Sequence, residues 1–412
     1  MTAQIVIANK HGIALASDSA VTVSTGANQQ KIYSANKLFA LTKWHPVGVM
    51  IYNSAHFMGV PFEIIIKCYR AKIGRTSFGT LREYADDFVK YLTESENYCS
   101  AEEQDRHARQ LMIILFAKLQ KLIRKKIDES TDRGQHLSNL DISMIITREI
   151  DSRYASSRKE QIRYDFTEQF FKELRVKYDA LADQAMGRVF EKLLRTITKE
   201  NREKLKYIAI RALVCSTLPI DNGTGVVIAG FGDQEIFPHV ESYGIGGMVN
   251  NKLIHVKYNS AEINSGNNYA TIMPFAQREM VDTFMRGIDP NYQSAQEGFF
   301  DEMAGEYAET ALQELELAGY SVADREQLKS KISSIGEKAL GILREKLNAY
   351  SMDNYISPIL SAVSFLPKDE LSVMAEALVN LTSLKRHVTM DTETVGGAID
   401  VVDCQHLTGQ NH

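Results

Sequence analysis

After Met1 the chain reads Thr2-Ala-Gln-Ile-Val-Ile-Ala8, followed by Asn9-Lys-His-Gly12 and by Ile13-Ala-Leu-Ala-Ser-Asp18. The first and third segments are short, apolar and partly β-branched, which is typical of strands, and the segment between them favours a tight turn. The sequence therefore predicts a β-hairpin. Because the strands of a hairpin run antiparallel, this hairpin brings Asp18 beside Thr2.

The rest of the chain alternates between strand patterns and helix patterns. Further strands are predicted at residues 37–41, 47–52, 223–233, 235–238, 252–256 and 395–403. Residues 62–212 form a large helical insertion, in which apolar side chains recur every three or four positions, and a second helical block covers 274–386. We expect a single domain over 1–412 with an α/β (α+β) fold, in which helical layers pack on both outer faces of two sheets.

Composition narrows the choice of partners. The formal net charge of -5 lacks the basic excess that would neutralise phosphates, so no nucleic acid partner is expected. No apolar run approaches the roughly 18 residues that a membrane span requires. No secretory signal is recognisable, and the four cysteines are scattered without a CxxC pair, which favours a reducing cytoplasm. No phosphate-binding loop and no HExxH pattern occurs, so neither a cofactor nor a metal is expected.

Thr2 is the first candidate for chemistry because it directly follows Met1. Removal of Met1 is favoured by a small second residue and would leave a hydroxyl and an α-amino group on the same residue. An α-amino group titrates near pH 8, so its neutral form can act as the general base for that hydroxyl. The ordinary alternative is a plain N-terminus, since many cytosolic chains begin Met-Thr.

Lys37 is the second candidate, because it heads the next apolar run and can direct its ammonium group at the Thr2 hydroxyl. A nearby positive charge would lower the pKa of that hydroxyl, and Asp18 would hold the lysine in place. Lys31 is a competing choice for the same role. For either lysine, the alternative is a solvated surface side chain.

These segments together resemble the opening of proteasome β-subunits and their bacterial relatives, which are N-terminal-nucleophile (threonine) hydrolases. The resemblance implies a four-layer αββα sandwich of two antiparallel sheets. It also implies that Thr2, Asp18, Thr22 and Lys37 line the active-site cleft. The interval before Lys37 is a few residues longer than in that family, which keeps Lys31 open.

Later segments add to the resemblance. Residues 227–233 resemble the central strand of the family, and Ile263-Asn-Ser265-Gly266 is similar to its Gly-Ser-Gly-Ser turn, which implies Ser265 as a proton relay. The closing motif is matched loosely, with Asp391 and Thr394 displaced. Where the family has small residues that stabilise the oxyanion, this chain has Tyr52-Asn-Ser, so the Tyr52 amide is the candidate donor.

The resemblance implies a threonine-type peptidase or amidase that cleaves a peptide or amide substrate through an acyl-enzyme on Thr2. It also implies a homo-oligomer. The insertion at 62–212 is far longer than the two helices found there in the family, and it could carry oligomer contacts or bind a protein partner. Two rivals remain, namely a catalytically silent scaffold and an amidase for a small molecule.

Overall fold

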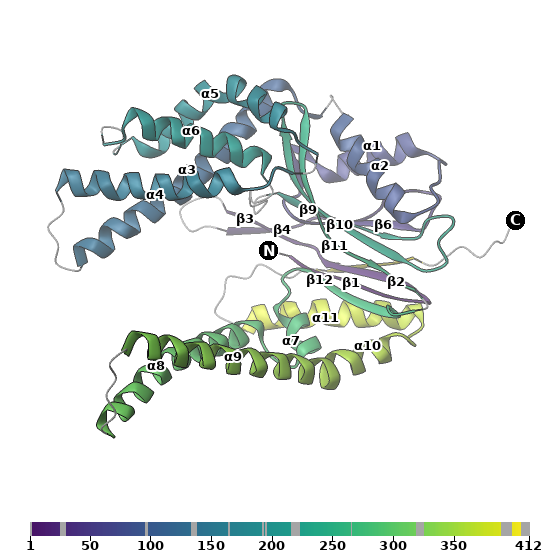
Figure 1. The fold of residues 1–412 in the computed structure, drawn as a ribbon. Helices are drawn as coiled ribbons and strands as arrows, with labels where there is room; N and C mark the ends of the chain where they lie inside the picture. The colour runs from purple at the N-terminus through teal and green to yellow at the C-terminus, as the bar shows by residue number, and fades with distance from the viewer. Residues whose placement is uncertain are drawn as a thin grey trace, which may run out of the picture.

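The computed structural model describes residues 2–24, 30–94, 98–132, 138–163, 165–191, 193, 196–215, 223–264, 266–318, 325–388 and 398–404; for 21–24, 30–34 and 132 it describes the backbone alone. The described part has a mixed α/β fold, in which helices surround two antiparallel sheets (Figure 1). No helix in these ranges is long and apolar enough to cross a membrane.

The first sheet has the strand order β12-β1-β2-β13. The predicted hairpin is confirmed: β1 (Ala3–Asn9) pairs with β2 (Gly12–Asp18), and Gln4 lies opposite Ser17. β12 (Ala270–Ala276) pairs with the free side of β1, and β13 (Ile399–Cys404) pairs with β2. Thr2 and Asp18 therefore lie at the same end of this sheet.

The second sheet has the order β11-β10-β9-β6-β5. Its strands are β5 (Leu38–Ala40), β6 (Val47–Asn53), β9 (Thr224–Gly230), β10 (His239–Val249) and β11 (Lys252–Glu262). The prediction of a strand at 235–238 was wrong, because the Glu235 carboxylate accepts the backbone N–H groups of Gly232 and Leu81 and fixes a turn there. The next strand is β10, which begins at His239. It was not predicted because its glycines interrupt the apolar pattern.

The two sheets pack face to face through an apolar core. Val6 and Ala8 of β1 contact this core together with Met50 of β6 and Val227 of β9. The alternate residues of β1, Ala3, Ile5 and Ile7, belong to a second core beneath α11 (Lys368–Val388). Successive side chains of a strand point to opposite faces, so Thr2 faces the other sheet, as Val6 does.

Helices cover the outer faces of both sheets (Figure 1). α1 (Phe62–Ile73) and α2 (Leu81–Glu94) pack on the second sheet, while α7 (Glu279–Arg286), α10 (Ser357–Val363) and α11 pack on the first. The second helical block therefore begins at Glu279 and not at 274, because the apolar run before it pairs with β1 as β12.

The remaining helices form two groups, one that packs against the second sheet and one that projects from the molecule (Figure 1). α3 (Ala101–Asp132), α4 (Asn139–Lys159), α5 (Glu168–Phe190) and α6 (Lys199–Val214) share a core that also includes Val249 of β10 and Ile254 of β11, which confirms the predicted helical character of 62–212. α8 (Pro290–Leu317) and α9 (Arg325–Ser351) form a projecting pair, followed by a π-helical turn (Met352–Ile356). Two short hairpins, β3 (Ala20–Ser24) with β4 (Gln30–Ser34) and β7 (His56–Phe57) with β8 (Val60–Pro61), were not predicted.

Candidate active site

Three side chains named from the sequence meet at one end of the sheets. The Lys37 ammonium donates to Thr2 Oγ1 at 3.0 Å, to Asp18 Oδ1 at 2.9 Å and to the carbonyl oxygen of Ala20 at 2.6 Å. An ammonium group has three protons, and these three bonds use all of them. Because Thr2 Oγ1 accepts from Lys37, the hydroxyl proton of Thr2 remains to be donated to a base.

The backbone explains why these side chains converge. Thr2 directly precedes β1, Asp18 ends β2, and Lys37 directly precedes β5 in the facing sheet. The Ala3 N–H donates to Asp18 Oδ1 at 3.1 Å, so the same carboxylate oxygen holds both the start of β1 and Lys37. The Lys37 carbonyl accepts the N–H of Ile51 at 2.9 Å, which fixes the lysine to β6.

The cluster is almost completely buried, with exposed fractions of 5% for Thr2, 1% for Asp18 and 4% for Lys37. Burial lowers the pKa of Lys37 below its ordinary value of 10.5, and the charge and hydrogen bond of Asp18 partly oppose that effect. A buried lysine paired with one carboxylate and placed against a hydroxyl is a typical arrangement for activating a nucleophile.

The structure also sorts the weaker candidates. It describes only the backbone of Thr22 and Lys31, in β3 and β4, so it tests neither side chain, whereas Lys37 Nζ contacts Thr2. Asp391 and Thr394 lie outside the described residues. Tyr52 is in β6, directly after Ile51, whose carbonyl oxygen accepts a hydrogen bond from Gln4 Nε2 at 2.7 Å, so it lies near the start of β1.

Ser265 also lies outside the described residues. Asn264 and Gly266 belong to the connection between β11 and β12, and β12 starts opposite Asn9. That connection is therefore at the far end of β1, about 20 Å from Thr2 at 3.3 Å per residue. The residues that follow β12 lie beside Thr2, where the Gln277 N–H donates to the Thr2 carbonyl oxygen.

The residues that sequence reasoning missed are Ala276 and Gln277. Ala276 pairs with Ala3, and the Gln277 N–H donates to the carbonyl oxygen of Thr2 at 3.1 Å. Ala276 has a φ of 60°, a left-handed conformation that is unfavourable for a residue with a Cβ and that often occurs at functional sites. No motif marks these positions, because their importance comes from the register of β12 on β1.

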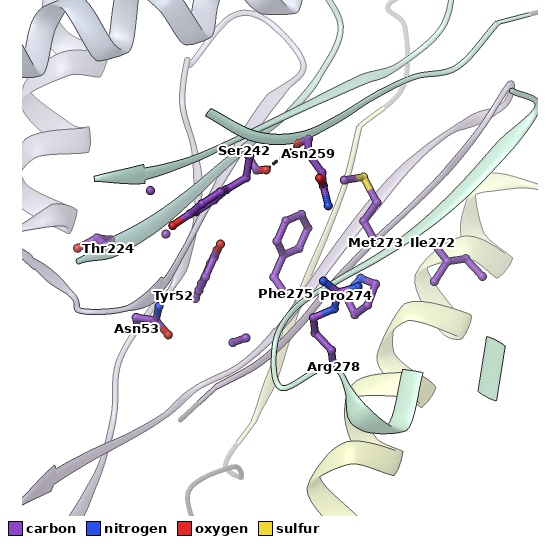
Figure 2. Close-up of a pocket in the computed structure, with 14 residues that line it drawn as sticks. Tyr52, Asn53, Thr224, Ser242, Asn259, Ile272, Met273, Pro274, Phe275 and Arg278 are labelled. Atoms are coloured by element: carbon purple, nitrogen blue, oxygen red, sulfur yellow. Dashed lines mark hydrogen bonds between the residues drawn. The ribbon is translucent and has the colours of Figure 1, made fainter. Parts of the chain in front are cut away.

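A pocket opens beside this cluster, between β12 and the second sheet (Figure 2). Its volume is about 480 Å³. The side chains of Tyr52 and Phe275 project into it, with Ser242 and Asn259 on one side and Arg278 on the opposite side. A cavity of this size suits a small molecule or a part of a larger substrate.

Among the described residues, no group of three or more His, Cys, Asp or Glu side chains is arranged to hold a metal ion. A scan of protein-family models found no match to this chain, and comparisons with curated proteins and with solved structures found none either.

Proposed function

We propose that this protein is an N-terminal-nucleophile hydrolase, a threonine-type amidase or peptidase, with a four-layer αββα arrangement of helices and sheets. The observation that carries the proposal is the contact of Lys37 Nζ with both Thr2 Oγ1, at 3.0 Å, and Asp18 Oδ1, at 2.9 Å, in a buried cluster. Asp18 offsets the cost of burying the Lys37 charge, and the placement of this charge against a hydroxyl supports a chemical role for the cluster.

In the proposed reaction, cleavage of the Met1–Thr2 bond first frees the α-amino group of Thr2. Thr2 Oγ1 then attacks the carbonyl carbon of the substrate, and the hydroxyl proton passes to the α-amine. Collapse of the tetrahedral intermediate breaks the C–N bond, and the amine leaves with that proton. Water, deprotonated by the same amine, hydrolyses the ester on Thr2 and restores the hydroxyl.

Lys37 stabilises the negative charge that develops on Oγ1, and Asp18 keeps Lys37 in place and protonated. Backbone N–H groups near Tyr52, at the end of β6, are the proposed oxyanion donors. Asn53, the last residue of β6, has a φ of 64°, a left-handed conformation that asparagine adopts readily and that turns the chain at the end of the strand. Cytoplasmic location and self-assembly belong to the same proposal.

Intact mass is the first test of the proposal. A purified protein without Met1 is the expected species, because only that species has a free amine on Thr2. A folded protein that retains Met1 would lack the general base and would contradict the mechanism.

Labelling by a β-lactone is the second test. The lactone should acylate wild-type protein once, at Thr2, and the Thr2→Ala variant should remain unlabelled. Thr93→Ala, which removes an exposed helical hydroxyl of α2, serves as the matched control and should label normally. Equal labelling of the wild-type and Thr2→Ala proteins, or none of either, would favour a catalytically silent scaffold.

A further inference from the structure

We propose that the pocket beside Thr2 binds an aromatic carboxylate, such as an N-acylated aromatic amino acid, and that this group is the part of the substrate adjacent to the bond that is cleaved. Its assignment as a substrate group rests on the proposed function. The proposal that the pocket binds an aromatic carboxylate is independent of that function, because it depends on the lining of the pocket alone.

The pocket lies at the same end of the sheets as the candidate nucleophile. Ala276 lines it and pairs with Ala3, the residue after Thr2. Arg278, two residues after Ala276, also lines the pocket. Gln277, between them, donates its N–H to the Thr2 carbonyl oxygen. A group bound in the pocket is therefore next to the start of β1.

The aromatic part of the ligand is indicated by the pocket walls. Tyr52, Tyr258 and Phe275 all line the cavity, and the rings of Tyr52 and Phe275 lie 5.8 Å apart at a tilt of 37° (Figure 2). Aromatic rings favour tilted or offset contacts with a further ring. Burial raises the pKa of Tyr52 to about 12, so its hydroxyl stays neutral and can hydrogen-bond to the ligand at neutral pH.

Two glycines build these walls. Gly225 lies opposite Tyr52 across β6 and β9, and a Cβ at Gly225 would come within 2.0 Å of the Tyr52 ring. Gly244 lies opposite Gly225 in β10, and a Cβ there would come within 2.5 Å of the Tyr258 hydroxyl oxygen. A side chain at position 225 or 244 would fill the space that Tyr52 or Tyr258 occupies. The two glycines therefore determine the shape of the pocket.

The anionic part of the ligand is indicated by charge. Among the described residues that line the pocket, Arg278 is the one charged side chain, and none is acidic. Arg278 Nε lies 3.5 Å from Asp282 Oδ2, and a guanidinium carries five N–H donors in a fork that matches a carboxylate. A cationic ligand would find no acidic partner among these side chains, whereas a carboxylate can pair with Arg278.

The remaining lining is neutral, and the volume sets the size of the ligand. Asn53, Thr224 and Asn259 offer amide and hydroxyl groups, and the Ser242 hydroxyl donates to the Asn259 carbonyl oxygen at 2.6 Å. About 480 Å³ accommodates one or two amino acid residues and not a long folded segment. The pocket thus favours a small acyl-amino acid or the last residues of a peptide.

Calorimetric titration of the Thr2→Ala protein with N-acetylphenylalanine tests the inference without catalysis. We expect binding that weakens about tenfold for N-acetylphenylalaninamide, which keeps the ring and lacks the charge, and by a similar factor for N-acetylalanine, which lacks the ring. Arg278→Gln should also weaken N-acetylphenylalanine about tenfold. Arg109→Gln removes an exposed arginine of α3 outside the pocket and should leave the affinity unchanged.

Gly225→Ala is a second variant, because displacement of the Tyr52 ring should reduce binding even where Arg278 is intact. No binding of N-acetylphenylalanine, or equal affinity for its neutral amide, would overturn the inference. Undiminished affinity in Arg278→Gln would overturn it as well. If Thr2→Ala binds N-acetylphenylalanine and the wild-type protein hydrolyses no N-acylated amino acid, the result would contradict the proposed function. It would still support the binding site.

Discussion

At the scale of single residues, Lys37 is the side chain on which the site depends. It is 4% exposed and its ammonium donates to Thr2, Asp18 and Ala20. Asp18 is 1% exposed, so removal of the lysine takes a neighbouring positive charge away from a buried carboxylate. The cluster is therefore coupled to stability as well as to chemistry.

Lys37→Met should abolish hydrolysis and lower the free energy of unfolding by about 3–5 kcal/mol, because it removes the ammonium group that pairs with the buried Asp18 carboxylate. Urea unfolding and an amidase assay measure the two effects. Lys90→Met, which removes an exposed lysine of α2, is the control and should change neither by much. Full stability in Lys37→Met would show that the pair with Asp18 is not formed.

The pH profile of kcat/KM should be bell-shaped. Its acidic limb reflects the α-amine of Thr2, which must be neutral and titrates near pH 8. Its alkaline limb reflects the deprotonation of Lys37, whose pKa is lowered from 10.5 by burial. Asp18 raises the pKa of Lys37, so in Asp18→Asn the alkaline limb should move to lower pH and the bell should narrow. An unchanged alkaline limb in that variant would contradict the role of Lys37.

At the scale of elements, β10 is joined to α2 and β11 by a buried carboxylate. Glu241 of β10 has a fully buried side chain and pairs with Arg82 at 3.2 Å, with Lys257 at 2.6 Å and with His239 Nε2 at 3.2 Å. The pKa of Glu241 is lowered to about 2, and that of His239 is raised to about 9 by its hydrogen bonds to Glu235 and Glu241, which outweigh its burial.

The pH dependence of stability follows from these two shifts. The contribution of Glu241 is complete above its unfolded pKa of about 4.5 and is lost as the pH falls toward 2. The contribution of His239 is complete below its unfolded pKa of about 6.5 and is lost as the pH rises through 9. The cluster should therefore stabilise the fold most between about pH 4.5 and 6.5.

Glu241→Gln should lower the free energy of unfolding by about 3–5 kcal/mol at pH 6 and flatten its loss between pH 4.5 and 2. Denaturant titrations across this pH range measure both effects. Glu262→Gln, at the exposed end of β11, is the matched control. An equally steep acid transition in Glu241→Gln would show that another carboxylate governs acid unfolding.

A pair of glycine substitutions should have opposite effects. Gly225→Ala should lower the free energy of unfolding by about 1–3 kcal/mol, because its Cβ would collide with the Tyr52 ring. Gly298→Ala lies within α8 with open space around the new Cβ, and it should raise stability by about 0.4–1 kcal/mol. Thermal melts distinguish them, and a stabilised Gly225→Ala would contradict the packing of Tyr52 on β9.

At the scale of the whole molecule, stability should be distributed unevenly. The strands of the first hairpin are buried along their full length, whereas Ala308, Leu312 and Leu340 are the buried residues within the described parts of α8 and α9. Hydrogen exchange should therefore be slowest in β1 and β2 and fastest in the α8–α9 pair. Comparable protection of both regions would show that the projecting helices are covered in solution.

Local patterns in the sequence predicted the hairpin at Thr2, the strand after Lys37 and the helical character of 62–212, because apolar periodicity and turn residues determine such elements. They did not predict β10, because glycines interrupt its apolar pattern. They did not predict the pairing of β12 with β1 either, because that register joins strands far apart in the sequence. Asp18 was identified because it belongs to the same hairpin as Thr2, and Lys37 because it heads the next apolar run. Ala276, Gln277 and the tyrosine-lined pocket were not identified, because distant strands bring them to the site. Contacts set by distant strands require the folded chain.

Reaction with a peptide epoxyketone, followed by mass spectrometry of the N-terminal peptide, shows whether Thr2 acts as both nucleophile and base. Addition of the Thr2 hydroxyl to the ketone and opening of the epoxide by the α-amine would form a morpholine ring, which requires both groups on one residue. We predict one such adduct at Thr2, formed by the wild-type protein and lost in Lys37→Met. An unmodified N-terminal peptide, or an adduct on another residue, would contradict the account.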